Sequence, residues 1–237
     1  MIDRRELLTL GLGALSLGAT GLGVARLARA QAPAEESGLD PRLAARLELR
    51  SAYARKTENL VAAYLSRRTS SMLVEPLVTT GRLVYVAPGR LMLRDDALTG
   101  STTRVEGGRV SIVSNQQDTA ATTEQARTPV DPKGAPGLLW LRDRLLGLFD
   151  PDDGSALIAG TEATAPRGRK ARIELRPPGG TLVRKVVRSV IVTMDPVGGA
   201  VLSISIAEAQ GDTYELELSD HRQNVEEEEI ERLLERR

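Results

Sequence analysis

The chain has 237 residues, a length that fits one large domain or two small ones. Lys plus Arg and Asp plus Glu both total 32, so no overall charge directs the chain towards nucleic acid or an anionic membrane. With no cysteine and one histidine, the composition excludes disulfide scaffolds, cysteine-ligated metals and thiol catalysis, and it leaves little for a histidine-based site.

Residues 1–32 follow the plan of an export signal. The pair Arg4-Arg5 precedes an uncharged run over residues 7–25, and alanines follow at 28, 30 and 32. The segment 3–8 resembles a twin-arginine signal, while an ordinary secretion signal or an uncleaved anchor stays open because the run is long enough to span a bilayer. We expect a polar tether at 33–41 and a domain over 42–237, soluble in the periplasm once the signal is removed.

The first part of the domain predicts a helix followed by strands. Asp40 and Pro41 supply a cap and a first helical residue, and apolar residues then recur at steps of three and four to about Arg67. Beyond that residue the period changes to two. Strands are predicted at 72–77, 81–87, 90–94, 102–106 and 109–114, and an edge strand or loop at 116–127.

The second part repeats this order. A helix over 137–149, with leucines on most of its sides, is predicted to be enclosed, and the acidic turn after it ends that helix. Strands are predicted at 157–163, 170–176, 187–194, 201–207 and 213–219. A short acidic helix capped by Asn224 closes the chain. The fold class is therefore α+β: an antiparallel sheet that curls over helices on its concave side into an incomplete barrel.

One segment carries a family resemblance. The run Gly81-Arg-Leu-Val-Tyr-Val-Ala-Pro88-Gly-Arg-Leu91-Met-Leu93 resembles the signature of the periplasmic outer-membrane lipoprotein carrier (LolA-like) family. In that family a Gly-x-apolar strand runs seven residues to a proline, and an apolar strand follows. Similar segments occur at 64–66, 71–77, 105–112, 145–149 and 204–218. The resemblance implies an eleven-stranded half barrel, lidded by helices, whose apolar cavity carries acyl chains, and it implies that the protein is no enzyme.

One departure from the family concerns the lid. Lipoprotein carriers of this family have an arginine immediately before the proline, which holds the lid shut, whereas this chain has Ala87. The run over residues 75–91 looks closer to a LolA-like branch associated with the export of other lipids.

Strand alternation places apolar side chains on one side of each predicted meander, and Val190, Val192, Leu202, Ile206 and Leu218 share that side in the second. Together with the resemblance, the alternation gives the predicted lipid-binding residues: Leu83, Tyr85, Leu91, Leu93, Val110, Ile112, Leu141, Leu145, Phe149, Ile204 and Leu216. The alternation alone favours a closed core over a cavity, and the family resemblance reverses that preference. The helix over 137–149 likewise fits either buried packing or a movable lid.

These features favour a monomeric carrier, without metal or cofactor, that shuttles an acylated lipoprotein or another lipid towards the outer membrane. Its expected partners are an inner-membrane transporter and an outer-membrane acceptor, and no nucleic acid. No acid, base and nucleophile can be assembled into a catalytic site. There are two alternatives. One is a lipid-responsive regulator that binds a membrane protein, and the other is an envelope protein with a filled sheet. Basic residues between Arg167 and Arg188 either meet anionic headgroups or form a solvated face.

Overall fold

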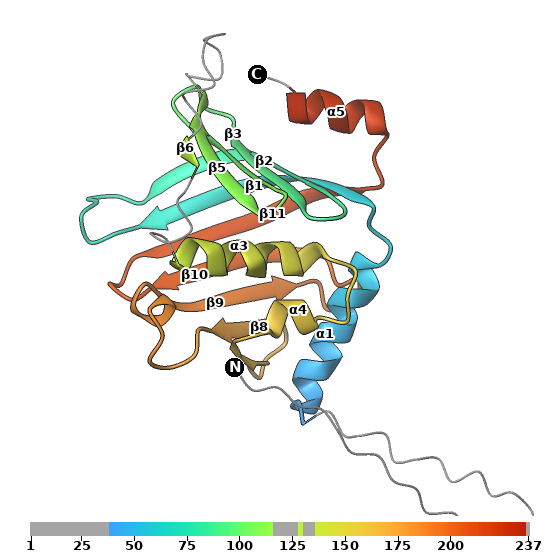
Figure 1. Ribbon diagram of the computed structural model, residues 1–237, viewed down its shortest axis with the longest axis vertical. Helices are drawn as coiled ribbons and strands as arrows, with labels where there is room; N and C mark the ends of the chain where they lie inside the picture. The colour runs from blue at the N-terminus through green and yellow to red at the C-terminus, as the bar shows by residue number, and fades with distance from the viewer. Residues whose placement is uncertain (1–37, 116–127, 130–135, 236–237) are drawn as a thin grey trace, which may run out of the picture. The chain divides into compact units, whose positions relative to one another are not determined.

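The computed structural model describes residues 38–115, 128–129 and 136–235 of the chain. Its strands form one eleven-stranded antiparallel sheet in the order β6-β5-β4-β3-β2-β1-β11-β10-β9-β8-β7 (Figure 1). Two meanders, β1 to β6 and β7 to β11, are therefore joined where the first and last strands pair. The strands are β1 (Asn59–Thr69), β2 (Leu77–Val86), β3 (Arg90–Asp95), β4 (Ser101–Glu106), β5 (Arg109–Ser114), β6 (Thr128–Pro129), β7 (Glu162–Thr164), β8 (Ala171–Arg176), β9 (Val187–Met194), β10 (Val201–Glu208) and β11 (Thr213–Gln223).

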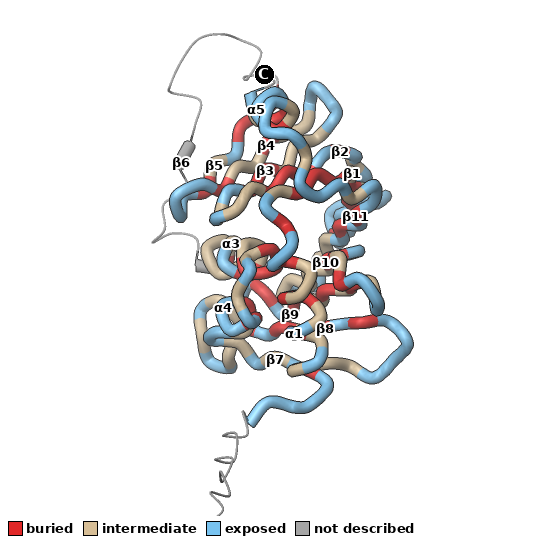
Figure 2. The backbone as a smooth tube through the Cα atoms, turned by 90° about the vertical axis from the view of Figure 1, so that its right-hand side faces the viewer, coloured by how far each residue is buried: buried red, intermediate tan, exposed pale blue. Residues whose placement is uncertain are grey.

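The sheet curls around its helices, as the side view shows (Figure 2). The inner face packs against α1 (Pro41–Ala54), α3 (Pro136–Phe149) and α4 (Ser155–Ile158) in one large apolar cluster. A short 3-10 turn, η2 (Val183–Lys185), precedes β9. The predicted fold class, a curved antiparallel sheet with helices on its concave side, is thus confirmed.

The closing helix α5 (Glu227–Glu235) lies on the opposite face of the sheet from the other helices. Its Ile230 and Leu233 pack against Val61, Val84 and Met92, which point outward from β1, β2 and β3. The expectation that the helices lie only on the concave side is therefore wrong for α5. Asn224 does not cap α5, because its side chain accepts a hydrogen bond from the Glu58 amide (2.9 Å) and donates to the Lys56 carbonyl (2.9 Å).

The predicted helix over 41–67 is wrong in its second half. Helix α1 begins at Pro41, where the Asp40 carboxylate accepts a hydrogen bond from the Arg42 amide (2.7 Å), but it ends at Ala54. Residues 59–69 form β1, the central strand, which pairs with β2 on one side and β11 on the other. Helix α5 covers part of the outer face of β1, and the inner cluster covers its inner face. Apolar side chains therefore occur on both faces of this strand, so its sequence does not alternate between polar and apolar residues.

Two further strand predictions are wrong in position. Residues 71–76 form an exposed turn between β1 and β2, and β2 begins only at Leu77. Residues 155–158 form α4 rather than a strand, because the Asp152 and Asp153 carboxylates accept hydrogen bonds from the amides of Gly154, Ser155 and Ala156 and so start a helical turn. The edge strand β7 follows with three residues.

The remaining predicted strands, and the helix over 137–149, are found within a few residues of their expected bounds. The export signal, residues 33–37 of the tether and the segment 116–127 lie outside the described residues. Within the described ranges, no helix is both long and apolar enough to cross a bilayer.

Candidate functional site

The inner apolar face of the sheet is the predicted site, and the structure divides its residues into two groups. Seven of them are buried in the inner cluster: Leu83, Tyr85, Leu91, Val110, Phe149, Ile204 and Leu216. Three, Leu93, Leu141 and Leu145, are only partly buried and pack against that cluster. The last, Ile112, is 44% exposed.

These groups follow the strand register. In one row across β2 to β5, Leu83 lies opposite Leu93, Leu93 opposite Thr103, and Thr103 opposite Ile112. Burial falls along this row, from full at Leu83 through partial at Leu93 to 44% exposure at Ile112. The inner face therefore opens towards the β4–β5 side along this row.

The neighbouring row is closed. Tyr85 lies opposite Leu91, Leu91 opposite Val105, and Val105 opposite Val110, and all four side chains are buried. The Tyr85 ring also lies 5.2 Å from the Phe149 ring at the end of α3, measured between centroids. These residues form a packed core, so they line space for a ligand only if α3 moves.

Helix α3 shows a similar gradient along its length. In its last turn Gly147, Leu148 and Phe149 are buried, whereas Leu138 and Leu141 near its start are partly exposed. At Gly147 an added Cβ would approach the Leu157 backbone of α4 to 3.1 Å, so this glycine allows the two helices to pack closely. The C-terminal end of α3 is therefore held tightly, and its N-terminal half is less enclosed.

A buried arginine on α1 fastens that end of α3. The Arg50 side chain, 1% exposed, donates to the Asp150 carbonyl oxygen and to the Asp152 carboxylate, directly after α3. The Asp150 carboxylate accepts a hydrogen bond from the Tyr85 hydroxyl of β2 (3.0 Å). This Arg50 junction joins α1, β2 and the α3–α4 turn.

The two carboxyl groups of the junction have opposite pKa shifts. Burial raises the pKa of Asp150, although the hydrogen bond from Tyr85 offsets part of that rise. Burial would also raise the pKa of Asp152, but hydrogen bonds from Arg50 and from the Ala156 and Gly154 amides outweigh it and lower the pKa. Asp152 is thus the anionic partner of Arg50.

A second buried cation holds α3 to α4. Arg144 donates to the carbonyl oxygens of Leu157 (2.6 Å) and Ala159 (2.7 Å). Its guanidinium carbon also lies 5.7 Å from the centre of the Trp140 ring. Burial lowers the pKa of Arg144.

The sequence prediction missed both arginines. A signal for Arg50 was present, because it lies at helical spacing from Leu43, Leu47 and Ala54 on the buried side of α1. The acidic turn after α3, which the sequence indicated as a helix end, caps α4 and receives Arg50. No group of three or more His, Asp or Glu side chains that could hold a metal ion occurs in the described part of the chain.

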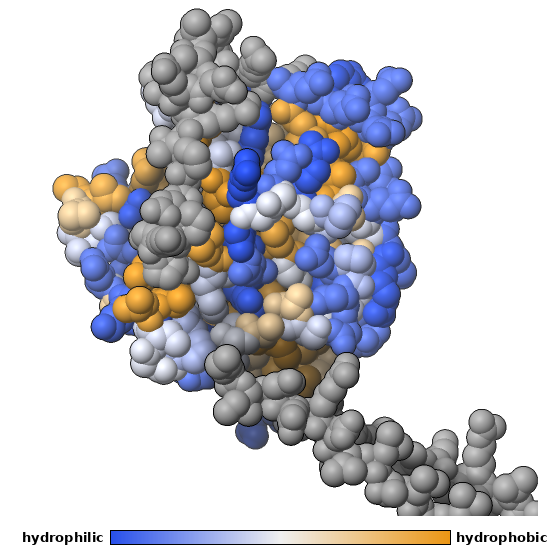
Figure 3. Space-filling model, viewed as in Figure 1, coloured by the Kyte–Doolittle hydropathy of each residue, from blue (hydrophilic) through white to orange (hydrophobic). Residues whose placement is uncertain are grey.

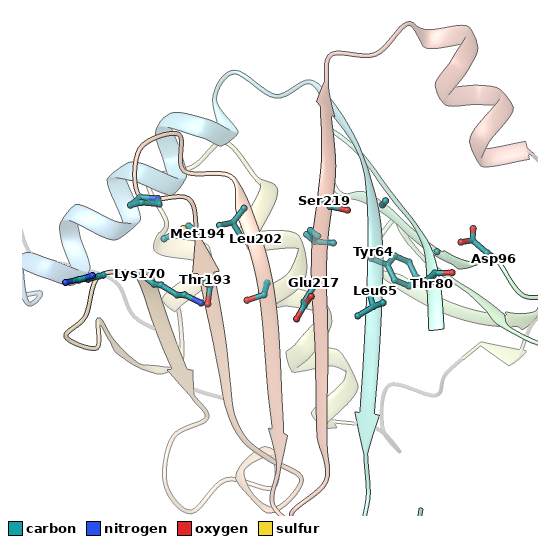
Figure 4. Close-up of a pocket in the computed structure, with 16 residues that line it drawn as sticks. Tyr64, Leu65, Thr80, Asp96, Lys170, Thr193, Met194, Leu202, Glu217 and Ser219 are labelled. Atoms are coloured by element: carbon teal, nitrogen blue, oxygen red, sulfur yellow. The ribbon is translucent and has the colours of Figure 1, made fainter. Parts of the chain in front are cut away.

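An open groove of about 610 Å³ crosses the outer face of the sheet over β1, β2, β9, β10 and β11 (Figure 4). Leu65, Thr80 and Glu217 are among the residues that line it, and Lys170 lies towards one end. Leu202, predicted to point inward, lines this groove instead, because the register of β10 against β9 shifts between Val201 and Ser203. The groove contains none of the eleven predicted lipid-binding residues.

Comparison with known proteins finds likeness in structure. No family model and no curated protein matches this chain. Similar solved structures include the MucA/MucB complex of Pseudomonas aeruginosa (10% identity, 79% of this chain and 60% of that chain, TM-score 0.42). They also include a LolA superfamily protein from Nitrosomonas europaea (6% identity, 78% of this chain and 95% of that chain, TM-score 0.39). A third is a putative outer membrane lipoprotein-sorting protein domain from Vibrio parahaemolyticus (10% identity, 81% of this chain and 98% of that chain, TM-score 0.41). This chain thus spans about 60% of the length of the chain it matches in the MucA/MucB complex. The similar structures thus include one from the family that the sequence resembles.

Proposed function

We propose that this chain is a non-enzymatic periplasmic carrier that holds an acyl chain against the inner face of its sheet, under the N-terminal half of α3. One observation carries the proposal: apolar side chains on both sides of that space, Leu93 and Ile112 on the sheet and Leu141 on α3, are not fully covered by the protein itself. A filled core would bury all three.

The chemistry of an acyl chain suits such a surface. A chain of about 16 carbons gains on the order of 12 kcal/mol when it leaves water, at about 0.8 kcal/mol per methylene, and it needs no directional partner. Entry requires the N-terminal half of α3 to move away from the sheet, since the row from Tyr85 to Val110 stays sealed beside Phe149 at the fixed end of that helix. The Arg50 junction and Arg144 would keep the other end of α3 in place during that motion.

The proposal includes export by the N-terminal signal and delivery from an inner-membrane transporter to an outer-membrane acceptor. Its first test is mass spectrometry of the organic extract of the freshly purified protein, which should contain a lipid. The Leu93→Glu variant should lose that lipid while staying folded, because a carboxylate at a partly exposed position can be hydrated.

The matched control is Leu202→Glu, which places the same charge on the outer face. This variant should keep the lipid at the wild-type level. Absence of lipid from the wild-type extract, or equal retention by both variants, would contradict the proposal.

A further inference from the structure

The hairpin that joins β1 to β2 presents an apolar surface to solvent. Met72 is 87% exposed and Val74 is fully exposed, and Leu73, Leu77 and Val78 are exposed as well. Soluble proteins rarely expose so many large apolar side chains in one short segment unless that segment binds something. None of these five side chains belongs to either apolar cluster of the described residues.

A second apolar pair lies at the same end of the sheet. Leu182 and Val186, in the segment before β9, are 67% and 50% exposed. The register places this segment near the hairpin, because Thr69 lies opposite Thr213, Thr213 opposite Ala207, and Ala207 opposite Ser189. Three strand spacings separate β1 from β9, about 15 Å. We call residues 67–78 and 182–188 together the hairpin edge (left side of Figures 1 and 3).

The hairpin edge is also basic. It contains five basic residues, Arg67, Arg68, Arg184, Lys185 and Arg188, and one acidic residue, Glu75. The adjoining β10–β11 turn adds Glu208 and Asp212, and the Asp212 carboxylate lies 3.8 Å from the Arg68 guanidinium. Five positive charges against three negative ones leave this end of the molecule cationic.

We propose that the hairpin edge docks the protein on a bilayer that contains anionic lipid. Exposed apolar side chains flanked by basic ones are the chemistry of interfacial membrane binding, in which the apolar groups enter the headgroup region and the cations stay at the phosphates. A protruding hairpin tip buries little area against another protein, whereas a lipid interface deforms around it. The docking does not depend on whether the inner face carries lipid.

The absence of cysteine from the chain permits a test in the full-length protein. A fluorescent label is attached to Val74→Cys, at the hairpin tip, or to Val197→Cys, which is 86% exposed in the β9–β10 turn at the other end of the strands. Quenching by aqueous iodide is then measured with vesicles of equal parts phosphatidylglycerol and phosphatidylcholine. The label at 74 should be shielded severalfold, and the label at 197 should stay accessible, which separates hairpin insertion from binding through the N-terminal segment.

Variants then test the chemistry of docking. Val74→Ser should lower the vesicle partition coefficient about tenfold, since burial of one valine side chain corresponds to about that factor. Lys185→Gln should weaken binding at low salt, and phosphatidylcholine vesicles should bind the wild type more weakly than anionic ones. Equal iodide access at positions 74 and 197 on vesicles would overturn the proposal. So would shielding of position 74 in the absence of vesicles that grows with protein concentration, because a second copy would then be the occupant.

Discussion

The Arg50→Met variant tests the junction that holds the end of α3. The substitution keeps an unbranched apolar stem but removes a cation that is 1% exposed and binds the Asp150 carbonyl and the Asp152 carboxylate. Breaking a buried ion pair from one side typically costs about 3 to 5 kcal/mol. The cost should fall at the lower end, about 3 kcal/mol, because Asp152 is partly exposed and keeps its hydrogen bonds to the α4 amides.

The chain offers a convenient assay for this variant. Trp140, on α3, is the only tryptophan, so its fluorescence follows this helix during urea or thermal unfolding. A loss of 3 kcal/mol should lower the melting temperature by about 6 to 12 °C for a chain of this size. The matched control is Arg55→Met, which removes an exposed ion pair to Glu48 (2.7 Å) at the end of α1 and should cost less than about 1 kcal/mol. Equal effects of the two substitutions would refute the reasoning.

Three other predictions follow from single contacts. Gly81→Ala should cost about 2 kcal/mol, because the new Cβ would overlap the Arg94 carbonyl oxygen and the Tyr64 ring, whereas Gly179→Ala, in open surroundings, should be neutral in the same urea titration. The lowered pKa of Asp152 stabilises the fold above the unfolded value of 3.8, and this contribution is lost as the pH falls through the lower folded value. The stability gap between the wild type and Asp152→Asn should therefore shrink from pH 7 to pH 3, and an unchanged gap would argue against the ion pair. Leu91→Glu should unfold the protein, by circular dichroism, because Leu91 is buried in the closed row; a folded variant would show that this row is open.

Much of the fold could be predicted because its turns are explicit in the sequence. Apart from β6 and β7, the strands after residue 80 were found where Gly and Pro turns separate residues of alternating polarity, as at Pro88-Gly89 between β2 and β3 and Gly107-Gly108 between β4 and β5. Strand β1 was missed because its register gives it partners on both sides and apolar cover on both faces. A short apolar run of that kind has the same appearance in a helix and in a central strand.

The candidate site was predicted as a set of inward-facing residues, and this part of the prediction could not distinguish core from cavity. The alternation that places Leu83 and Leu93 on one face says nothing of how far each is covered, since coverage depends on where α3 lies across the sheet. The sequence also could not predict contacts between residues that lie far apart along the chain. Arg50 and Asp152 are separated by about a hundred residues, and only the folded chain brings them together.

The central claim is that an acyl chain binds between α3 and the inner face of the sheet. The most direct test is a titration of the full-length protein with a brominated fatty acid, because bromine quenches tryptophan only at close range and Trp140 packs against the inner cluster. The account predicts saturable quenching of Trp140, which Leu93→Glu abolishes and Leu202→Glu leaves unchanged. Fluorescence that stays constant through the titration, or quenching that Leu93→Glu does not alter, would contradict it.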